Sequence, residues 1–357
     1  MSLDKLLLSS IITMYLLLAG VLGIQLWSNV HAPTTVADTT ISDRPPTHTS
    51  ESTTIPRVLL DNLRYQQAAV GDNYSFPLGS YTTNPQAALV NLLCRYTTGS
   101  TVRTTTGSGF FVSPDGVILT NAHVAQFLLL ENLTDAPGTT ECIVRSGNPA
   151  TPQYKAQLLY MPPAWIQNHA SDIVATKPTG TGERDYALLY ISDSLTSQPL
   201  PAQFPALRTR TTLLPRSSIG TPVIAAGYPA GERFHNTNAY LAPNQATTSI
   251  AALYTFGDNV ADVIALHGST LGTHGASGGP IINNNGIVLG LISTRGDDAL
   301  HGQGSLRAIT LSYIDRTIQQ ETGFSLNETL HGNVQYRAQV FTETLAPFLS
   351  AILQNEL

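Results

Sequence analysis

The sequence predicts an all-β domain, a barrel or a sandwich of many short strands, which follows an apolar N-terminal stretch. Three observations predict this class. From Ala87 to about Thr322, short apolar runs alternate with turn residues, which is typical of short strands. Only 12% of the 357 residues are charged, about half of the usual share of roughly 25%, and the 42% that are hydrophobic can build a core. The many Thr, Ser, Gly and Pro residues suit strands and turns better than charged surface helices.

The predicted strands fall into two groups of six. The first group comprises Ala88–Tyr96, Gly107–Val112, Val117–Thr120, Glu141–Arg145, Tyr154–Tyr160 and Tyr186–Ser192. The second group comprises Val223–Ala226, Thr247–Tyr254, Asp262–His267, Pro280–Ile282, Ile287–Ser293 and Leu306–Thr310. A Pro-rich crossing, Gln198 to Pro215, separates the groups, and Leu311–Glu321 is predicted to form a helix after the last strand.

The stretch from Leu6 to Trp27 contains no charged residue. As a helix rising about 1.5 Å per residue it would span roughly 33 Å, enough to cross the hydrocarbon core of a bilayer. A cleaved signal peptide is the alternative, but the best small-x-small site, Val30-His31-Ala32, is poor and is followed by Pro33. We therefore expect residues 1–27 to be an uncleaved single-pass membrane anchor, with the rest of the chain on the extracytoplasmic side.

Residues 28–86 are expected to link the anchor to the β-rich domain. Ser28 to about Pro56 is rich in Thr, Ser and Pro and poor in apolar residues, which predicts a flexible stalk. The apolar residues between Val58 and Ala69 indicate either a short helix or a stiffer part of that stalk.

Charge and cysteine content exclude several kinds of partner. The net charge is −6 and no basic run occurs, so a nucleic-acid partner is not expected. Cys94 and Cys142 belong to no CxxC or Cys/His cluster, so no metal site is expected. Both cysteines fall in predicted strands of the first group of six. We favour a disulfide over two buried thiols, because export would place the domain in an oxidising compartment.

A glycine-rich loop, Thr273-His274-Gly275-Ala276-Ser277-Gly278-Gly279-Pro280, suggests acyl-transfer chemistry. Gly275 and Gly278 allow tight turns, so the loop can aim the Ser277 hydroxyl and two backbone N–H groups at one point. A nucleophile and donors for a developing oxyanion are what acyl transfer needs. Gly-rich turns before a strand are common, however, so the loop alone is a weak signal.

Two further stretches strengthen the interpretation. His123 follows Gly116-Val117-Ile118-Leu119-Thr120, and Asp185 directly precedes the apolar run Tyr186–Ile191. A core histidine and a turn aspartate are the structural alternatives, and Asp172 is a rival for the acid. The order His, Asp, Ser along the chain is that of chymotrypsin. From about Ala87 to about Thr322 the chain resembles the trypsin/chymotrypsin-like serine proteases, most closely their bacterial HtrA-type branch.

The resemblance implies a fold and a set of catalytic roles. The fold would be two six-stranded antiparallel β-barrels, about 87–197 and 216–322, closed by a C-terminal helix. His123 would be the general base and then the acid, Asp185 would orient it, and Ser277 would be the nucleophile. The N–H groups of Gly275 and Ser277 would form the oxyanion hole. No metal or cofactor would be needed.

Several positions depart from the family pattern. The base of the specificity pocket would be Leu271, so cleavage after small or medium apolar residues is expected rather than after Lys or Arg. Ser293 would line that pocket from the substrate-pairing strand, and Arg295 would narrow or cap it.

Where trypsin-like zymogens have an aspartate before the nucleophile, this chain has Ala276, so we expect no activation by a new N-terminus. The separation of His123 from Asp185 is long for this branch, and the excess is expected in loops around Asn132–Thr140 and Pro162–Gly182.

The C-terminal tail, residues 323–357, is shorter than the ~50 residues that a domain usually needs, so the peptide-binding PDZ domain of many HtrA-type proteins is not expected. Leu345, Phe348, Leu349 and Ile352 are spaced as on one face of a helix, with Pro347 at a kink or in the first turn. We expect this helix to pack on the barrels or on a neighbouring subunit.

The sequence thus predicts a membrane-anchored extracytoplasmic serine endopeptidase with polypeptide substrates and a role in protein quality control. The alternatives are a peptide-binding pseudoprotease and a surface scaffold, and whether the chain forms a homo-oligomer is left open.

Overall fold

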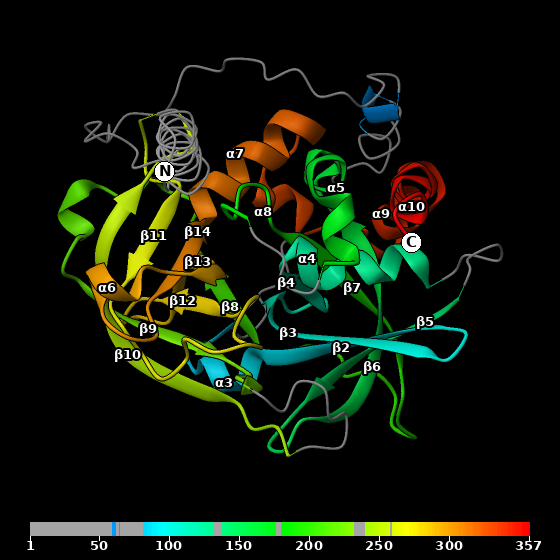
Figure 1. Ribbon diagram of the computed structural model, residues 1–357, viewed down its shortest axis with the longest axis horizontal. Coiled ribbons are helices and arrows are strands. Elements are labelled where there is room, and N and C mark those ends of the chain that lie inside the picture. Colours follow the sequence, from blue (N-terminus) through cyan, green and yellow to red (C-terminus); the bar gives the residue numbers. More distant parts are fainter. Residues whose placement is uncertain are drawn as a thin grey trace, which may run out of the picture. The chain divides into compact units, whose positions relative to one another are not determined.

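Two β-barrels form the body of the chain in the computed structural model (Figure 1). The structure describes residues 59–61, 64, 81–131, 138–175, 180–231, 240–257 and 259–357. The chain divides into two compact units, Met1–Thr40 and Ile41–Leu357, and every described residue belongs to the second.

The first barrel is closed and antiparallel, with strands in the order β2-β3-β4-β7-β6-β5. β2 and β3 form a long hairpin whose pairing continues to its tip, where Thr98 lies opposite Thr101. All four residues of β4 are buried, because the strand lies in the barrel wall with further elements outside it. The strands are β2 Leu89–Thr98, β3 Thr101–Ser113, β4 Val117–Thr120, β5 Thr139–Ser146, β6 Thr151–Tyr160 and β7 Ala187–Ser194.

The second barrel closes through the pairs β9–β10, β10–β11, β11–β14, β14–β13, β13–β12 and β12–β9, all antiparallel. Two short strands extend it, since β8 pairs in parallel with β13 and β1 pairs in parallel with β8. The strands are β1 Tyr81–Thr82, β8 Ala206–Thr209, β9 Pro222–Gly227, β10 Asn244–Tyr254, β11 Val263–Leu266, β12 Pro280–Ile282, β13 Ile287–Arg295 and β14 Leu306–Thr310.

The two predicted six-stranded barrels are therefore confirmed, and the strand ends differ by a few residues. The largest difference is β3, which begins at Thr101 rather than at Gly107. Its first residues, Thr101 to Thr106, lack apolar alternation, but they pair along their whole length with β2. β1 and β8 were not predicted, because β1 has only two residues and β8 lies within the stretch interpreted as a Pro-rich crossing.

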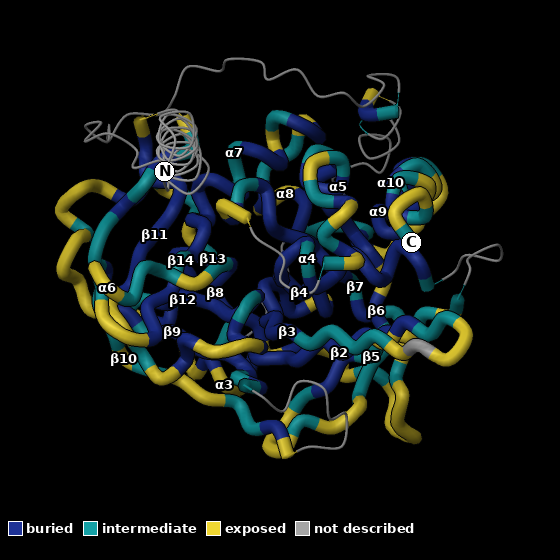
Figure 2. The backbone as a smooth tube through the Cα atoms, in the orientation of Figure 1, coloured by how far each residue is buried: buried dark blue, intermediate teal, exposed yellow. Residues whose placement is uncertain are grey.

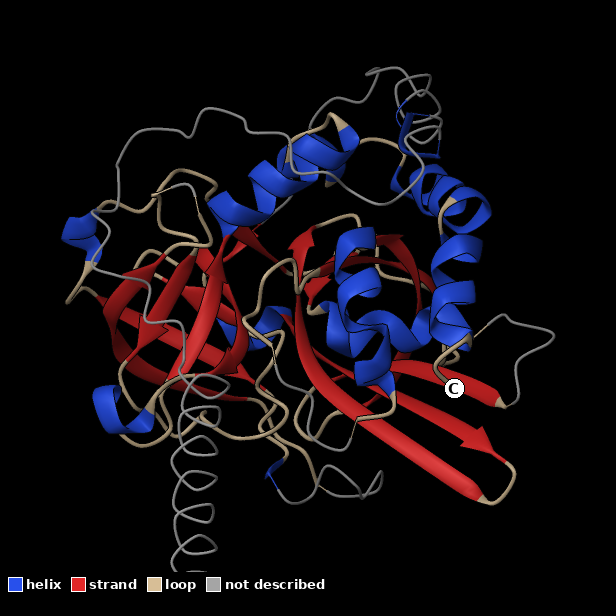
Figure 3. Ribbon diagram, turned by 45° about the horizontal axis from the view of Figure 1, so that its top comes forward, coloured by secondary structure: helices blue, strands red, loops and turns tan. Residues whose placement is uncertain are grey.

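Helices cover the barrels and join them (Figure 3). The helix predicted after the last strand is present as α7. It begins at the cap Thr310, whose side chain accepts from Tyr313 N, and ends at the left-handed Gly323. The helices are α3 Pro85–Ala88, α4 Ala122–Ala125, η1 Gln126–Leu130, α5 Pro163–His169, η2 Ala170–Ile173, η3 Arg216–Ser218, α6 Asp298–His301, α7 Leu311–Thr322, α8 Leu326–Thr329, α9 Val334–Thr344 and α10 Ala346–Gln354.

The C-terminal tail packs on the first barrel. α9 lies against β6 and β7, and α10 lies against α5 and η1. Phe341, Leu345, Leu349 and Leu353 are fully buried at four-residue intervals, so one continuous apolar face of α9 and α10 joins the core (Figure 2). The Ser350 hydroxyl donates to the Leu129 carbonyl at 2.7 Å. Pro347 occupies the first turn of α10, where its missing N–H costs nothing.

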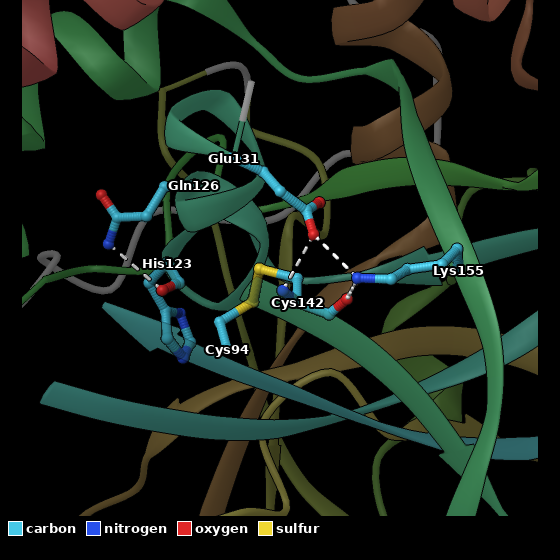
Figure 4. Close-up of a disulfide and its surroundings, with 6 residues drawn as sticks. All are labelled: Cys94, His123, Gln126, Glu131, Cys142 and Lys155. Carbon is cyan, nitrogen blue, oxygen red and sulfur yellow. Dashed lines mark hydrogen bonds and ion pairs between the residues drawn. A yellow bond between two sulfur atoms is a disulfide. The ribbon is translucent and has the colours of Figure 1, made fainter. Parts of the chain in front are cut away.

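Cys94 and Cys142 face each other on β2 and β5 and are joined by a disulfide, with Cα atoms 4.1 Å apart (Figure 4). Glu131, at the end of η1, accepts from Cys142 N and from Lys155 Nζ, both at 3.1 Å. The disulfide therefore lies in a stretch where β5 and β6 are tied to the segment that follows His123.

Several expectations fall on residues outside the described ranges. These are the anchor over residues 1–27, the stalk, and the loop segments 132–137 and 176–179. Of the helix suggested within Val58–Ala69, Leu59–Asp61 and Arg64 are described, and they are helical. Within the described part of the chain, no helix has the length and apolarity that a membrane span needs.

Candidate active site

The loop that carries Ser277 belongs to the second barrel but is attached to the first by Ser108 of β3. The Ser108 hydroxyl donates to Gly275 O at 2.6 Å and accepts from Tyr228 N at 2.8 Å. Its backbone N–H donates to Ser277 O at 2.7 Å, and its carbonyl accepts from the Thr120 hydroxyl. Ser108 is fully buried. Its N–H and hydroxyl therefore tie Gly275 and Ser277 of the loop, together with Tyr228, to the first barrel.

The loop conformation requires glycine at two positions. Gly275 has φ +96° and Gly278 has φ +86°, both in the region that disfavours side chains. A Cβ at Gly275 would lie 2.5 Å from Tyr228 O, and one at Gly278 would lie 1.9 Å from Ser108 O. The close approach of the loop to β3 thus depends on Gly278, and its approach to the segment after β9 depends on Gly275.

Ser277 is half-buried, and its hydroxyl donates to Ser293 O at 3.3 Å. Among the described residues, no group accepts a hydrogen bond from the N–H of Gly275 or of Ser277. Two donors beside a serine hydroxyl are therefore available to a ligand. The described contacts include no hydrogen bond between Ser277 and His123.

His123 and Asp185 are in direct contact. Asp185 Oδ2 lies 2.8 Å from His123 Nδ1, and Oδ1 accepts from the backbone N–H of His123 at 3.0 Å. The side chain of His123 is 29% exposed and that of Asp185 is 6% exposed. α4, which supplies His123, begins after β4 and the intervening Asn121, and Asp185 lies two residues before β7, the strand paired with β4. This pairing brings the two residues together.

The pair shifts both pKa values. Burial by itself would lower the pKa of His123, but the charge and hydrogen bond of Asp185, with the charge of Asp172, outweigh it and raise this pKa. Burial would raise the pKa of Asp185, but His123 and the hydrogen bond from Ser293 outweigh it and lower this pKa. Near neutral pH, Asp185 is therefore a carboxylate and holds His123 Nδ1 as the donor.

Ser293 connects the acid and the serine. Its hydroxyl donates to Asp185 Oδ2 at 2.7 Å, and its carbonyl is the acceptor for Ser277. The β13–β14 register shifts between Ile292 and Thr294, so Ser293 sits in a bulge, which commonly re-aims a side chain. From the sequence Ser293 was assigned to the specificity pocket, and its contact with the acid was missed.

Two buried residues beside the site were also missed. Asn121 is fully buried and its Nδ2 donates to Asp185 O at 2.8 Å. Ser108 lies in the predicted strand Gly107–Val112, and no role was expected for it. Asn121 carries a weak local signal, as a polar residue between the strand Val117–Thr120 and His123. Ser108, between Gly107 and Gly109, carries none, because its partners lie far along the chain.

The other two pocket candidates lie apart from these contacts. Leu271 is fully buried in the apolar core of the second barrel. Arg295 ends β13 with a side chain that is 65% exposed, and its Nη2 pairs with Asp298 of α6 at 3.0 Å. Over the described ranges, no three His, Cys, Asp or Glu side chains are grouped to hold a metal ion.

Comparisons with known proteins identify the family. The family model of the trypsin-like peptidase domain matches residues 107–291, more than half of the chain. The chain therefore belongs to the trypsin-like peptidase family, and it is a serine peptidase. The comparison with curated proteins finds no match.

Solved structures that resemble the chain include two proteases. One is the Rv3671c protease from M. tuberculosis. Its active form has 19% identity and a TM-score of 0.40, with 78% of this chain and 94% of that chain covered. Its inactive form has 19% identity and a TM-score of 0.38, with 66% and 90% covered. The other is the HtrA-type protease AlgW with a decapeptide, at 18% identity and a TM-score of 0.41, with 66% and 64% covered.

We predict that Ser108→Ala will weaken both stability and activity. The variant leaves Gly275 O and Tyr228 N buried without their partner, which should cost about 1–3 kcal/mol in the free energy of unfolding. A displaced nucleophile loop should lower kcat by about 10- to 100-fold. Urea unfolding and steady-state kinetics measure the two effects.

Ser113→Ala is the matched control. Ser113 is also fully buried on β3, but its hydroxyl accepts only from Asp115 N, at 3.2 Å. Its kcat should stay within about threefold of the wild-type value. Equal kcat values for the Ser108 and Ser113 variants would contradict the anchoring role of Ser108.

Proposed function

We propose that the chain is a membrane-tethered, extracytoplasmic serine endopeptidase that uses His123, Asp185 and Ser277 as its catalytic triad. The observation that carries the proposal is the junction at Ser293, which hydrogen-bonds the acid of the His123–Asp185 pair and also the Ser277 hydroxyl. A histidine oriented by a buried carboxylate, beside a serine on a Gly-rich loop, is the arrangement that acyl transfer requires.

The proposed mechanism begins with His123 in the tautomer that Asp185 holds, with the proton on Nδ1. The Ser277 hydroxyl exchanges the Ser293 carbonyl for His123 Nε2, a rearrangement consistent with the looser hydrogen bonds of substrate-free sites. Nε2 takes the proton as Oγ attacks the scissile carbonyl, and the N–H groups of Gly275 and Ser277 stabilise the oxyanion. The imidazolium then protonates the leaving amine. Water, deprotonated by Nε2, then attacks the acyl-enzyme, and as the bond to Oγ breaks the imidazolium returns that proton to Oγ, which releases the acid and restores the Ser277 hydroxyl.

A peptide-binding pseudoprotease is the alternative, and one contact favours it. The Ser277 hydroxyl is bonded to the Ser293 carbonyl and not to His123. If that contact persists when a peptide binds, Ser277 stays protonated and the peptide is held without being cut. The two functions differ in whether Ser277 can be activated, so a reagent that needs an activated serine separates them.

The membrane tether rests on the charge-free stretch from Leu6 to Trp27. It would place the peptidase on the extracytoplasmic side, consistent with the disulfide between Cys94 and Cys142. A role in protein quality control is the broadest part of the proposal. It rests on the likeness of the sequence motifs to the HtrA-type branch, whose substrates would be unfolded proteins or exposed segments.

One labelling experiment tests both activation and location. A membrane-impermeant fluorophosphonate applied to intact cells should label the full chain at Ser277, and the labelled protein should sediment with membranes. Ser277→Ala should abolish labelling and proteolysis, and Asp185→Asn should lower kcat by about 10⁴-fold.

The controls separate the parts of the proposal. Ser269→Ala, at a serine that is not fully buried near the start of the same loop, should label like the wild type. Folded wild-type protein that neither labels nor cleaves would establish the pseudoprotease. Labelled protein that remains soluble after cell lysis would overturn the tether and leave the peptidase standing.

Specificity is the second expected outcome. The buried, apolar Leu271 cannot pair with a basic side chain, so cleavage should follow small or medium apolar residues. A peptide library read by mass spectrometry checks this, and Leu271→Asp should shift cleavage toward Lys and Arg if Leu271 forms the pocket base. Cleavage mainly after Arg by the wild type would contradict the assignment.

The quality-control role has a separate test. Equal cleavage rates for a folded domain and its unfolded variant would contradict that role.

A further inference from the structure

One face of α7 supports the turn that carries Asp185. Tyr313, Thr317 and Glu321 recur at four-residue intervals and therefore line the same side of the helix. The backbone N–H of Arg184 donates to the Tyr313 hydroxyl at 3.2 Å, and the Tyr186 and Thr317 hydroxyls are 2.7 Å apart. The residues on both sides of Asp185 are thus bonded to α7.

The strongest contact on this face is a buried ion pair. Arg184 Nη1 pairs with Glu321 Oε1, and the two side chains are 7% and 3% exposed. The other carboxylate oxygen of Glu321 accepts from the hydroxyl of Tyr160, on β6. Glu321 therefore holds the turn before β7 and the end of β6 at the same time. Buried charges are retained where they have both a partner and further hydrogen bonds, as here.

The backbone at Arg184 needs such a restraint. Its φ is +54°, in the left-handed region that side chains disfavour, and among the described non-glycine residues only Asn259 shares a positive φ. The conformation tightens the turn, in which Asp185 N donates to Gly182 O and Tyr186 N donates to Arg184 O. Strained residues of this kind persist where the surrounding contacts over-determine them. At Arg184 those contacts come from α7.

We infer that the Arg184–Glu321 ion pair is a positioning device for the catalytic acid, which holds Arg184 in its left-handed conformation and so directs Asp185 toward His123. In the contacts given above, both residues act on Asp185 through the turn that precedes β7. The inference rests on the proposed function, because it explains how one member of the proposed triad, Asp185, is held in position.

The N-terminal segment braces the same helix end. Arg64 Nε donates to Glu321 O at 3.1 Å, and Arg64 Nη2 donates to Gln320 O at 2.7 Å. A cation that binds the last carbonyls of a helix stabilises that end. Arg64 therefore helps to fix the backbone at Glu321 and, through it, the turn at Asp185.

α7 also supplies a matched control. Arg316 Nη2 pairs with Asp262 at 2.5 Å, and the Asp262 side chain is 2% exposed. The Asp262 carboxylate also accepts from the Thr255 hydroxyl and from Phe256 N, in the second barrel. Glu321→Gln and Asp262→Asn each neutralise a buried carboxylate paired with an arginine. Only Glu321 is paired with a residue of the turn that carries Asp185.

The first test compares these two variants. Glu321→Gln should lower kcat by about 10- to 100-fold with KM nearly unchanged, because the acid is misplaced and not the substrate. The acid limb of kcat/KM should move to lower pH, since His123, which faces the charges of Asp185 and Asp172, loses part of the stabilisation of its imidazolium. Asp262→Asn should leave the limb in place and kcat within about threefold. An unshifted limb and unchanged kcat in Glu321→Gln would overturn the inference.

The second test separates positioning from charge. The double variant Arg184→Met/Glu321→Leu removes both charges, and apolar replacement of a buried pair commonly preserves the fold. If the pair positions Asp185, kcat should stay at least about tenfold low while near-UV circular dichroism matches the wild type. Recovery of kcat to within about threefold would show a merely structural role.

If neither variant folds, Tyr313→Phe decides, because it removes only the hydroxyl bonded to Arg184. A clear fall in its kcat supports the inference, and an unchanged kcat overturns it.

Fluorophosphonate labelling keeps the two failures apart. Wild-type protein that does not label at Ser277 refutes the proposed function. Wild-type protein that labels and cleaves, together with a Glu321→Gln variant of equal kcat and pH profile, refutes only the positioning role.

Discussion

The attachment of the Ser277 loop to Ser108 is the constraint on which the rest of the site depends. The two barrels have separate strand sets, and a contact at the site itself adds to their shared apolar core in holding them together. Ser108 does this with three hydrogen bonds to the second barrel, to Gly275 O, Tyr228 N and Ser277 O. Because the residue is fully buried, these bonds do not compete with water. Gly278 then allows the backbone of the loop to come this close to β3, because a Cβ there would lie 1.9 Å from Ser108 O.

Around that joint, the groups of the site are held in successive layers. His123 and Asp185 contact each other, Ser293 and Asn121 contact Asp185, and α7 contacts the residues on either side of it. Each layer comes from a different element: β13 supplies Ser293, the end of β4 leads to Asn121, and α7 supplies the outermost contacts. A carboxylate with so many neighbours can keep one orientation, as an orienting acid must.

Much of this architecture could be predicted from the sequence, and the reasons are local. β4 and β13 are short apolar runs between turn residues, so their strands were assigned nearly to the residue. His123, Asp185 and Ser277 each stand at the end of such a run or in a Gly-rich turn, which is why they could be singled out. The start of β3 could not be predicted, because Thr-rich strands show no apolar alternation.

The supporting residues could not be predicted, because their roles depend on contacts across the fold. The sequence placed Ser293 in the specificity pocket, whereas in the structure the bulge of β13 directs its hydroxyl toward Asp185. Glu321 looked like the polar end of a helix, and only the packing of α7 between the barrels makes it a partner of Arg184. The helices α5 and η2 were expected only as loop, since their few apolar residues gain meaning from contact with α10.

The contacts of Asp185 also set an order of assembly. Asn121 lies 64 positions before it, Ser293 lies 108 positions after it, and Glu321 lies 137 positions after Arg184. A polypeptide made from its N-terminus would thus have His123 and Asp185 long before Ser293 and Glu321 exist. The surroundings of the acid are complete only when α7 has been synthesised, so on a growing chain the full site is among the last parts to form.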